Sequence, residues 1–410
     1  MDAVILSIGS EVVTGQVADT NAQWAARELL RAGIPVTRIS AVDDLPEAIV
    51  EAVTGASAPD RLVWMTGGLG PTKDDITVDS VARALGVAVT EDSATRERIR
   101  AWYASRNRPL TEGGIRQARV PLGAEAFPNP VGSAPGIMIE REGCVYVMLP
   151  GVPAEMMAIA RESAIPRLAS RGRPGAMRIY RMAGVPEGGV DERLRDLWNG
   201  LKDNERFALQ IGQGEVILRA VIMGEDGEEC RVRLSELDGD IRRILGSDLY
   251  GTDWDSLEGT VIRLLGEGNL DLATAESVTG GIIAARLTAV PGASARFHGG
   301  MVAYRDPTKT GWLGVDPGLV AGHGTVSRET AAAMAEAARF KTGAAVGLAT
   351  TGWAGPDGGD DRDPVGTVYV GIDRDGEKSV HRYFHRGTRS AVREYAATFA
   401  LDLLRRSLCK

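Results

Sequence analysis

The sequence contains few of the residues that cross-link a protein or bind transition metals. Among its 410 residues are 3 cysteines and 4 histidines. Cys144, Cys230 and Cys409 are odd in number and far apart in the chain, a pattern that argues against a disulfide framework. The sequence has neither a CxxC nor an HExxH motif, which argues against a conventional zinc site.

Long apolar runs and an excess of basic residues are missing as well. No apolar stretch reaches the roughly 18 residues that a membrane span requires, and the N-terminus has an acid where a signal peptide needs basic residues. The 47 basic and 55 acidic side chains give a net charge of −8, which disfavours binding along a nucleic-acid backbone. We therefore expect a cytoplasmic protein that contacts neither membranes nor nucleic acid directly.

Glycine, in contrast, is abundant. The chain has 51 glycines, well above the average share of roughly 7%. Many of them lie where a short apolar run gives way to an amphipathic segment, which is typical of tight strand-to-helix turns. This alternation predicts α/β domains in which helices cover both faces of a largely parallel sheet. At roughly 100–200 residues per domain, the length predicts two to four domains.

The strand and helix patterns divide the chain into three units. A short basic segment rich in helix breakers, residues 170–175, separates the first unit from a smaller one. We expect a three-layer α/β domain over 1–170, a small α+β unit over 176–252, and a second three-layer α/β domain over 255–410. Because the middle unit carries no recognisable chemical motif, a role as spacer or dimerisation module is its simpler interpretation.

In the first unit, a glycine-rich loop follows the apolar run Leu62–Met65. It reads TGGLGPT and is followed by Lys73, Asp74 and Asp75. Such loops lie at the carboxyl ends of parallel strands, where ligands bind. Glycine N–H groups can approach phosphate oxygens there, and neighbouring acids can hold a hard cation. A tight turn followed by helix-capping acids is the alternative, and the loop alone does not decide between the two.

The third unit carries candidate residues at three predicted strand ends. Ser277 lies at a strand-to-helix junction, where helix-terminal N–H groups can bind a phosphate or a developing oxyanion. Lys309, five residues after Tyr304, can act as a base if burial removes its proton. Each also has a simpler interpretation: Ser277 can be a helix cap, Lys309 a surface charge and Tyr304 a packing residue. Spacing alone does not name a reaction.

The N-terminal motifs resemble those of the molybdopterin-binding fold that molybdenum-cofactor proteins share with the CinA family. They are GSExxxG, DTN, TGGLGPTxDDxT and PGVPxEM. In CinA proteins this resemblance implies a metal-dependent pyrophosphatase that converts ADP-ribose to AMP and ribose 5-phosphate. The implied residues are Gly67, Gly68, Gly70 and Thr72 around the pyrophosphate, and Asp74, Asp75, Glu11 and Asp43 around a divalent Mg, Mn or Co ion. Ser10 departs from the family pattern, which commonly has an acid here.

The C-terminal motifs are similar to those of the CinA C-terminal domain, the nicotinamide-nucleotide amidase family. Residues 257–410 contain TAESxTGG, HGxVS, TTGxAGPxGG and PVGTVYVG in this order. The resemblance implies metal-independent hydrolysis of nicotinamide mononucleotide to nicotinic acid mononucleotide and ammonia. The implied site comprises Ser277 as nucleophile or its hydrogen-bonding equivalent, Lys309 as general base, Tyr304 as positioning group, Thr279, Gly280 and Gly281 as backbone donors, Thr351 and Gly355 as pocket lining, and Arg389 and Arg393 at the 5′-phosphate. Val278 replaces a common cysteine, and Trp353 a small aliphatic residue.

Together the motifs make the chain resemble a full-length CinA family member, which implies a bifunctional enzyme that recycles pyridine nucleotides. A homodimer is the default for such enzymes. The middle unit is similar to the KH-like module of this family, but it lacks a GXXG loop with flanking basic residues, so we expect no RNA binding. Two alternatives stay open: a non-catalytic accessory protein in competence or DNA damage, and an N-terminal domain that binds molybdopterin.

Overall fold

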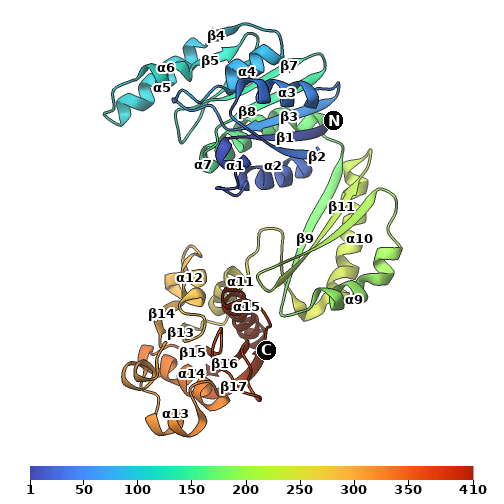
Figure 1. The fold of residues 1–410 in the computed structure, drawn as a ribbon. Helices are drawn as coiled ribbons and strands as arrows, with labels where there is room; N and C mark the ends of the chain where they lie inside the picture. Colours follow the sequence, from blue (N-terminus) through green and yellow to red (C-terminus); the bar gives the residue numbers. More distant parts are fainter. Residues whose placement is uncertain (410) are drawn as a thin grey trace. The chain divides into compact units, whose positions relative to one another are not determined.

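The computed structural model describes residues 1–409 (Figure 1). They form two compact units, each with its own internal packing. One comprises Met1–Ala176 with Met223–Arg231, and the other comprises Met177–Ile222 with the described chain from Val232 onward. Among residues 1–409, no helix combines the length and the apolar character that crossing a membrane requires.

The N-terminal segment is built on a mixed sheet. Its strands are β1 (Asp2–Ile8), β2 (Val36–Val42), β3 (Arg61–Thr66), β4 (Val89–Glu91), β5 (Arg119–Pro121), β6 (Glu125–Phe127), β7 (Gly136–Arg141) and β8 (Cys144–Leu149). Six of them form one sheet in the order β2–β1–β3–β8–β7–β6, while β4 and β5 pair separately. The first four strands of that order run parallel, and β7 and β6 are antiparallel additions at one edge.

Helices cover both faces of this sheet. They are α1 (Ser10–Val13), α2 (Thr20–Arg31), α3 (Pro46–Ala56), α4 (Thr77–Ala84), α5 (Ser93–Ser105), α6 (Glu112–Arg116), α7 (Pro153–Ile159) and α8 (Ile165–Leu168), with the short turns η1 (Ala160–Ala164) and η2 (Ala169–Arg171). Helices α2 and α7 pack on the face that carries Ile5 and Trp64, whereas α3 and α4 pack on the face that carries Val4 and Val63. Because successive strand residues point to opposite faces, the segment has three layers.

The middle segment is a small α+β unit. Its elements are β9 (Gly175–Ala183), α9 (Glu187–Asn199), β10 (Glu205–Gly212), β11 (Glu215–Met223), α10 (Gly227–Leu245), η3 (Gly246–Asp248) and β12 (Leu249–Thr252). The strands form one sheet in the order β10–β11–β9–β12. Alternate residues of β11 are buried, from Val216 to Ile222. The helices therefore cover one face of this sheet, and the residues of β11 on the other face are half-buried or exposed.

The C-terminal segment has a second mixed sheet. Its strands are β13 (Leu272–Glu276), β14 (Phe297–Val302), β15 (Val346–Gly352), β16 (Thr367–Arg374) and β17 (Glu377–Phe384). The strand order is β14–β13–β15–β16–β17. Strands β14, β13 and β15 run parallel, and β16 and β17 continue the sheet as an antiparallel pair.

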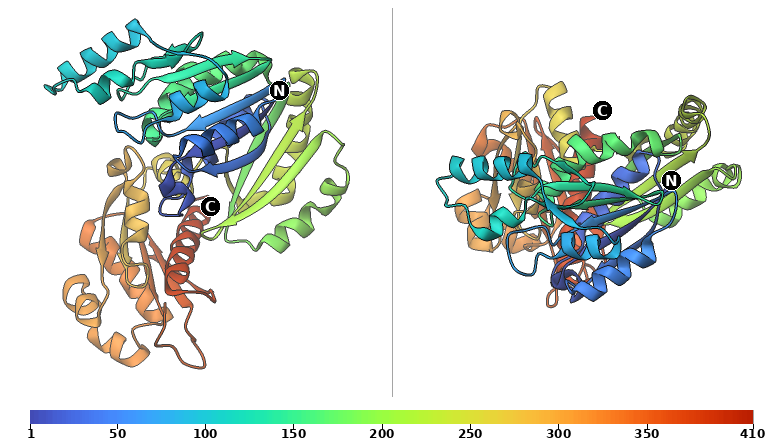
Figure 2. Two further views of the ribbon diagram at one scale, coloured as in Figure 1. Left: turned by 45° about the horizontal axis from the view of Figure 1, so that its top comes forward. Right: turned by 90° about the horizontal axis from the view of Figure 1, so that it is seen from above.

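This second sheet is also covered on both faces. The helices are α11 (Leu257–Glu267), α12 (Ile282–Thr288), α13 (Pro317–His323), α14 (Arg328–Thr342) and α15 (Arg389–Leu408), with the short turns η4 (Ala293–Ala295) and η5 (Thr308–Leu313). Residues of α11, α12 and α15 pack with Leu272 and Leu348, whereas α13 and α14 pack with Ala273 and Ala349. Figure 2 shows α15 running along one side of the sheet. The predicted fold class, two three-layer α/β domains and a small α+β unit, is confirmed.

Helix α15 also binds the middle segment through a network of charges near its C-terminal end. Asp402 and Arg405 are buried and form an ion pair. Arg405 Nη2 donates to the carbonyl oxygen of Ser247 at 2.6 Å. Arg406 bridges Asp402 and Asp248 at 2.7 and 2.8 Å. One helix therefore packs on the C-terminal sheet and holds the end of the middle segment.

Candidate active sites

The glycine loop after β3 has a backbone that requires glycine. Gly67 and Gly68 have φ values of 106° and 67°, in the left-handed region that other residues avoid. A Cβ atom on Gly67 would lie 2.1 Å from the carbonyl oxygen of Ile8, and one on Gly68 would lie 2.1 Å from Thr77 Oγ1. The loop therefore packs directly against the end of β1, and the segments that follow β1 and β3 meet there.

Thr72 organises the two aspartates that follow this loop. Its backbone N–H donates to Asp75 Oδ2 at 2.7 Å. Its hydroxyl contacts both Asp75 Oδ2 and Asp74 Oδ1. The hydrogen bond from Thr72 lowers the pKa of Asp74, so this carboxyl group stays ionised at neutral pH. Thr72 thus contacts the predicted metal ligands and does not line the neighbouring cavity.

A cavity of about 350 Å³ lies beside the loop. The predicted residues that line it are Gly67, Gly68, Gly70, Asp74, Asp75 and Glu11. Asp43 does not line it, and its Oδ1 accepts the N–H of Asp44 at 3.0 Å. Asp44 lines the cavity instead, so Asp44 replaces Asp43 in the set of candidate ligands.

Glu155 is a further carboxylate of this cavity, and the sequence did not single it out as a ligand. Its Oε2 accepts a hydrogen bond from Asn129 Nδ2 at 2.6 Å. A Cβ atom on Gly132 would lie 2.2 Å from its carboxyl group. Gly132 and Glu155 belong to the motifs GSAPG and PGVPAE, which are visible in the sequence. The sequence does not show, however, that the two residues are in contact.

The oxygen ligands around this cavity suit a hard divalent cation. Asp74 and Asp75 are adjacent, and Glu11, Asp44 and Glu155 line the same space. Within residues 1–409, however, no three acidic, histidine or cysteine side chains stand close enough together to form a ready-made metal site. The arrangement therefore fits the mode in which one or two carboxylates and the substrate's phosphate oxygens share the ion, as Mg²⁺ often binds.

The C-terminal site lies where three parallel strands end together. Glu276 is level with Val302 of β14 and with Thr350 of β15. Backbone hydrogen bonds continue this alignment, because the N–H of Ser277 donates to Thr350 O at 2.9 Å and the N–H of Ala303 donates to Glu276 O at 2.8 Å. The predicted residues Ser277 and Tyr304 therefore follow β13 and β14, and Thr351 lies near the end of β15, all at one edge of the sheet, where α/β proteins bind ligands.

The turn that carries Ser277 is held by a buried carboxylate. Glu276 is 1% exposed and accepts three backbone N–H groups: Oε2 from Gly281 at 2.9 Å and Ile283 at 3.1 Å, and Oε1 from Ala284 at 2.8 Å. These N–H groups lie in the first turn of α12, which otherwise has no partner for them. A negative charge at this end is also favoured by the helix dipole. Glu276 thus fixes the start of α12 relative to β13.

This arrangement corrects the expected donors of the turn. The N–H of Gly281 binds Glu276, and the N–H of Gly280 donates to Ser277 O at 3.2 Å. Both groups are therefore already used within the protein. The backbone N–H groups of Val278 and Thr279 have no hydrogen-bond partner within the described chain, residues 1–409. They are the donors of this turn that a developing oxyanion can use.

Buried threonine hydroxyls form hydrogen bonds at and beside this turn. Thr279 and Thr350 are fully buried, and their hydroxyl oxygens lie 2.7 Å apart. Thr351, predicted to line the pocket, is also fully buried, and its hydroxyl donates to Thr325 O at 2.7 Å. These hydroxyls tie the ends of β13 and β15 together and position the backbone of the turn.

Lys309 is a buried lysine at the same edge of the sheet. It lies in the turn η5, and its side chain is 2% exposed. Its Nζ contacts Asp306 Oδ1 at 3.3 Å. Burial lowers the pKa of Lys309, although the charge and hydrogen bond of Asp306 oppose this shift. Lys309 therefore holds its proton more weakly than a surface lysine, as a general base requires.

Tyr304 and the two predicted arginines connect this edge to α15. Tyr304 is 52% exposed, and the Arg389 guanidinium donates to its hydroxyl. Arg389 Nη1 also donates to Gly355 O at 2.6 Å, and Arg393 Nη2 donates to Thr279 O at 3.1 Å. The first turn of α15 thus brings positive charge to the loops after β13, β14 and β15. Arg389 uses two of its five donors here and keeps others for an anion.

Comparisons with known proteins cover the whole chain. Family models match in succession: a probable molybdopterin binding domain over 4–170, the KH domain of damage-inducible protein CinA over 177–251, and the CinA C-terminal domain over 254–408. A protein of Moorella thermoacetica, named "Putative competence-damage inducible protein", is 41% identical over 411 residues, which is 100% of this chain and 99% of that protein. The chain belongs to the CinA family.

Other CinA proteins give the same result. A CinA-like protein from Frankia casuarinae is 40% identical over 419 residues, covering 100% of this chain and 96% of that protein. Among solved structures, that of the protein CinA with unknown function from Thermoplasma acidophilum is 32% identical and covers 41% of this chain and 97% of that chain, with a TM-score of 0.38. The predicted membership of a full-length CinA family, with a KH-like middle segment, is confirmed.

Proposed function

We propose that the C-terminal site of this CinA family member hydrolyses the carboxamide of nicotinamide mononucleotide. Water and the amide give nicotinic acid mononucleotide and ammonia. The observation that carries this proposal is the buried Lys309, whose pKa is lowered by burial at the strand edge that also carries Ser277. The motif resemblance supplies the substrate, since the same residues are those implied for a nicotinamide-nucleotide amidase.

In this proposal Lys309 takes the proton from the oxygen that attacks the carboxamide carbon. That oxygen belongs to a water molecule or to the Ser277 hydroxyl. If Ser277 attacks, a water molecule then hydrolyses the resulting ester and releases nicotinic acid mononucleotide. The negative charge that develops on the carboxamide oxygen is bound by the N–H groups of Val278 and Thr279, which have no partner within residues 1–409. The protonated lysine returns its proton to the departing nitrogen, so that ammonia leaves as a neutral molecule. Arg389, held by Gly355 O, is placed to bind the 5′-phosphate.

Ammonia release from nicotinamide mononucleotide by the intact chain in EDTA tests this proposal directly. We expect stoichiometric release of ammonia and nicotinic acid mononucleotide, unaffected by EDTA, because every proposed group belongs to the protein. Absence of ammonia in both EDTA and Mg²⁺ would sink the proposal. A non-catalytic role, in line with the name of the Moorella relative, would then become the better hypothesis.

The pH dependence of this reaction tests the pairing of Lys309 with Asp306. The charge of Asp306 raises the pKa of Lys309, so the Asp306→Asn variant has a lower lysine pKa and a larger fraction of neutral amine at a given pH. We expect the rising limb of its kcat–pH profile to move to lower pH. Asp361→Asn, an exchange of an exposed loop acid, leaves the limb in place. A limb that moves to higher pH contradicts the assignment of Lys309 as the base.

We propose ADP-ribose pyrophosphatase activity for the N-terminal cavity as a second function. The observation that favours it is the position of the Gly67–Gly70 loop and of Asp74 and Asp75 on one cavity of about 350 Å³. Backbone N–H groups of such a loop bind a pyrophosphate. A divalent cation, when bound there, would polarise the phosphoryl oxygens and activate water. The protein holds the carboxylates in place. Thr72 does so through its N–H and its hydroxyl, which both contact Asp75.

The Asp75→Asn variant is expected to lower AMP release from ADP-ribose by roughly 10- to 100-fold, the usual cost of a weakened metal site. Ammonia release by the same variant should be unchanged, and EDTA should stop only AMP release. Asp191→Asn, an exposed acid on α9, serves as control. Equal AMP release by wild type and Asp75→Asn, with Mg²⁺ present, would rule out this assignment.

A further inference from the structure

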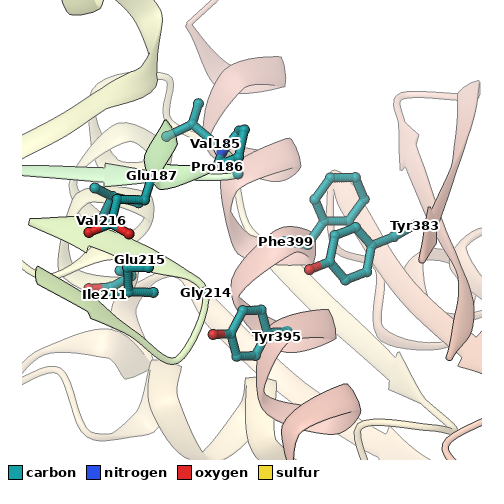
Figure 3. A pocket seen from close by; sticks show the side chains of 11 residues that line it. Val185, Pro186, Glu187, Ile211, Gly214, Glu215, Val216, Tyr383, Tyr395 and Phe399 are labelled. Atoms are coloured by element: carbon teal, nitrogen blue, oxygen red, sulfur yellow. The ribbon is translucent and has the colours of Figure 1, made fainter. Parts of the chain in front are cut away.

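A second cavity of about 350 Å³ lies between the middle segment and α15. Both of its walls belong to the compact unit that comprises Met177–Ile222 and the described chain from Val232 onward. Figure 3 shows its two walls. The middle segment contributes the loop Gly184–Glu187 and the turn of the β10–β11 hairpin around Gly214. Strand β17 and helix α15 contribute Tyr383, Tyr395 and Phe399. None of these residues belongs to either proposed active site, so this cavity is distinct from both.

One wall of this cavity is aromatic. Tyr383 and Phe399 stack with ring centroids 4.3 Å apart, and Tyr395 stacks on His385 at 4.0 Å. Each ring is thereby held in one orientation by a neighbour. The three lining rings are half-buried and not fully covered. Fixed aromatic faces of this kind bind planar rings by stacking.

Three polar groups that line the cavity are available to a ligand. The hydroxyls of Tyr383 and Tyr395 and the carboxylate of Glu187 have no hydrogen-bond partner within residues 1–409. Burial raises the pKa of Tyr383 to about 12, so this phenol is a neutral donor at physiological pH. Glu215 differs, because its carboxylate accepts from Tyr250 Oη at 2.9 Å and lies 3.4 Å from Arg286. The cavity thus offers two hydroxyls and one free carboxylate to a ligand.

The charge of the lining restricts the ligand further. Glu187 and Glu215 are its charged side chains, and no lysine or arginine of the described chain lines the cavity. A phosphate group would lie beside the Glu187 carboxylate, which repels it, and beside Glu215, whose charge Arg286 compensates at 3.4 Å. The volume is at the lower end of the roughly 300–1,000 Å³ of small-molecule pockets, which suits one ring system with a small substituent.

We propose that this cavity is a binding site for a planar heteroaromatic nucleoside without a phosphate group. The base stacks on the rings of Tyr395 and Phe399. An amino group of the base donates to the Glu187 carboxylate, and the hydroxyls of Tyr383 and Tyr395 serve ring nitrogens or ribose oxygens. The site lies on α15, the helix whose first turn carries Arg389 and Arg393, but its binding does not depend on the proposed amidase.

Fluorine NMR of the intact chain labelled with 3-fluorotyrosine tests this proposal, with adenosine as probe and AMP as its phosphorylated match. The chain has 8 tyrosines, and Tyr383→Phe and Tyr395→Phe assign the two resonances of interest. Because these resonances report on this cavity, binding at the N-terminal cavity does not move them. We expect saturable shifts of both with adenosine, and at least roughly tenfold weaker binding of AMP.

Two glutamate variants of α9 complete the test. Glu187→Gln should weaken adenosine binding roughly tenfold, the usual cost of losing a hydrogen bond to a charged group. Glu192→Gln removes the same charge from an exposed position of the same helix and should bind as wild type does. The proposal is overturned if adenosine up to about 1 mM moves neither resonance. It is equally overturned if AMP binds as well as adenosine, or if Glu187→Gln binds like Glu192→Gln.

Discussion

Replacing Lys309 by methionine is expected to abolish ammonia release from nicotinamide mononucleotide while the fold is retained. Methionine has a similar unbranched apolar chain, which suits a site where the side chain is 2% exposed. It has no proton to exchange, so the variant loses general-base catalysis, typically worth about 10²- to 10⁴-fold in kcat. Steady-state kinetics gives the loss, and the thermal unfolding midpoint shows whether the fold is intact.

Two further lysine variants separate the base from other roles of the charge. Lys309→Arg keeps the positive charge, but a guanidinium does not lose its proton at physiological pH. It should therefore be as inactive as Lys309→Met. Lys202→Met, at an exposed position of the middle segment, should have wild-type kinetics. An active Lys309→Arg would show that the site needs a cation here and would refute the general-base role.

The Glu276→Ala variant is expected to lose about 3 kcal/mol or more of unfolding free energy, since each buried donor left without a partner costs about 1–3 kcal/mol. Three backbone N–H groups at the start of α12 depend on this one carboxylate. The same change frees the turn that carries Ser277, so ammonia release should fall together with stability. Urea unfolding followed by circular dichroism measures the first effect.

Matched variants make the effect of Glu276 specific. Glu276→Gln keeps one acceptor oxygen but turns an amide N–H toward one of the three donors, so we expect an intermediate loss. Glu267→Ala removes an exposed glutamate that pairs with Arg263 on α11, and exposed pairs contribute up to about 1 kcal/mol. If Glu276→Ala proved as stable as Glu267→Ala, the three hydrogen bonds would not hold the turn.

The place of the C-terminal site was predictable because its motifs lie at strand ends. Ser277 follows a short apolar run and precedes a glycine pair, which indicates a strand-to-helix turn. The structure shows that Ser277 directly follows β13 and that Thr351 lies near the end of the adjacent parallel strand β15. Parallel sheets bring such ends to one edge, so local patterns were enough to gather these residues.

Contacts between side chains could not be predicted in the same way. Glu276 and Asp306 both lie within recognisable motifs. No periodic pattern, however, indicates that Glu276 accepts three N–H groups or that Asp306 contacts Lys309. The bond between Arg389 and Tyr304 joins residues 85 positions apart. In the N-terminal cavity, Asp43 and Asp44 are equivalent by sequence, and only the backbone after β2 decides which one lines it.

Two strands of the C-terminal sheet have weak signals in the sequence, although a strand end beside Tyr304 is predicted. Strand β14 contains Gly299 and Gly300, and glycine is depleted in strands. A Cβ atom on Gly300 would lie 2.4 Å from Thr274 Oγ1, so close packing against β13 explains that glycine. Strand β17 lies at the edge of the sheet and is mostly exposed on both faces. Edge strands of this polar kind lack the alternation that identifies a half-buried strand.

Helix α15 has a consequence for how this protein is made. Ribosomes synthesise chains from the N-terminus, so every other described element of the C-terminal unit emerges before this helix. Until it arrives, one apolar face of the nascent sheet, including Leu348 and Val370, has no complete cover. Such exposed surface attracts chaperones and promotes aggregation. The arginines at the start of the helix and the charges at its end belong to one element, so the candidate active-site edge is completed and the middle segment is attached in the same step of biosynthesis.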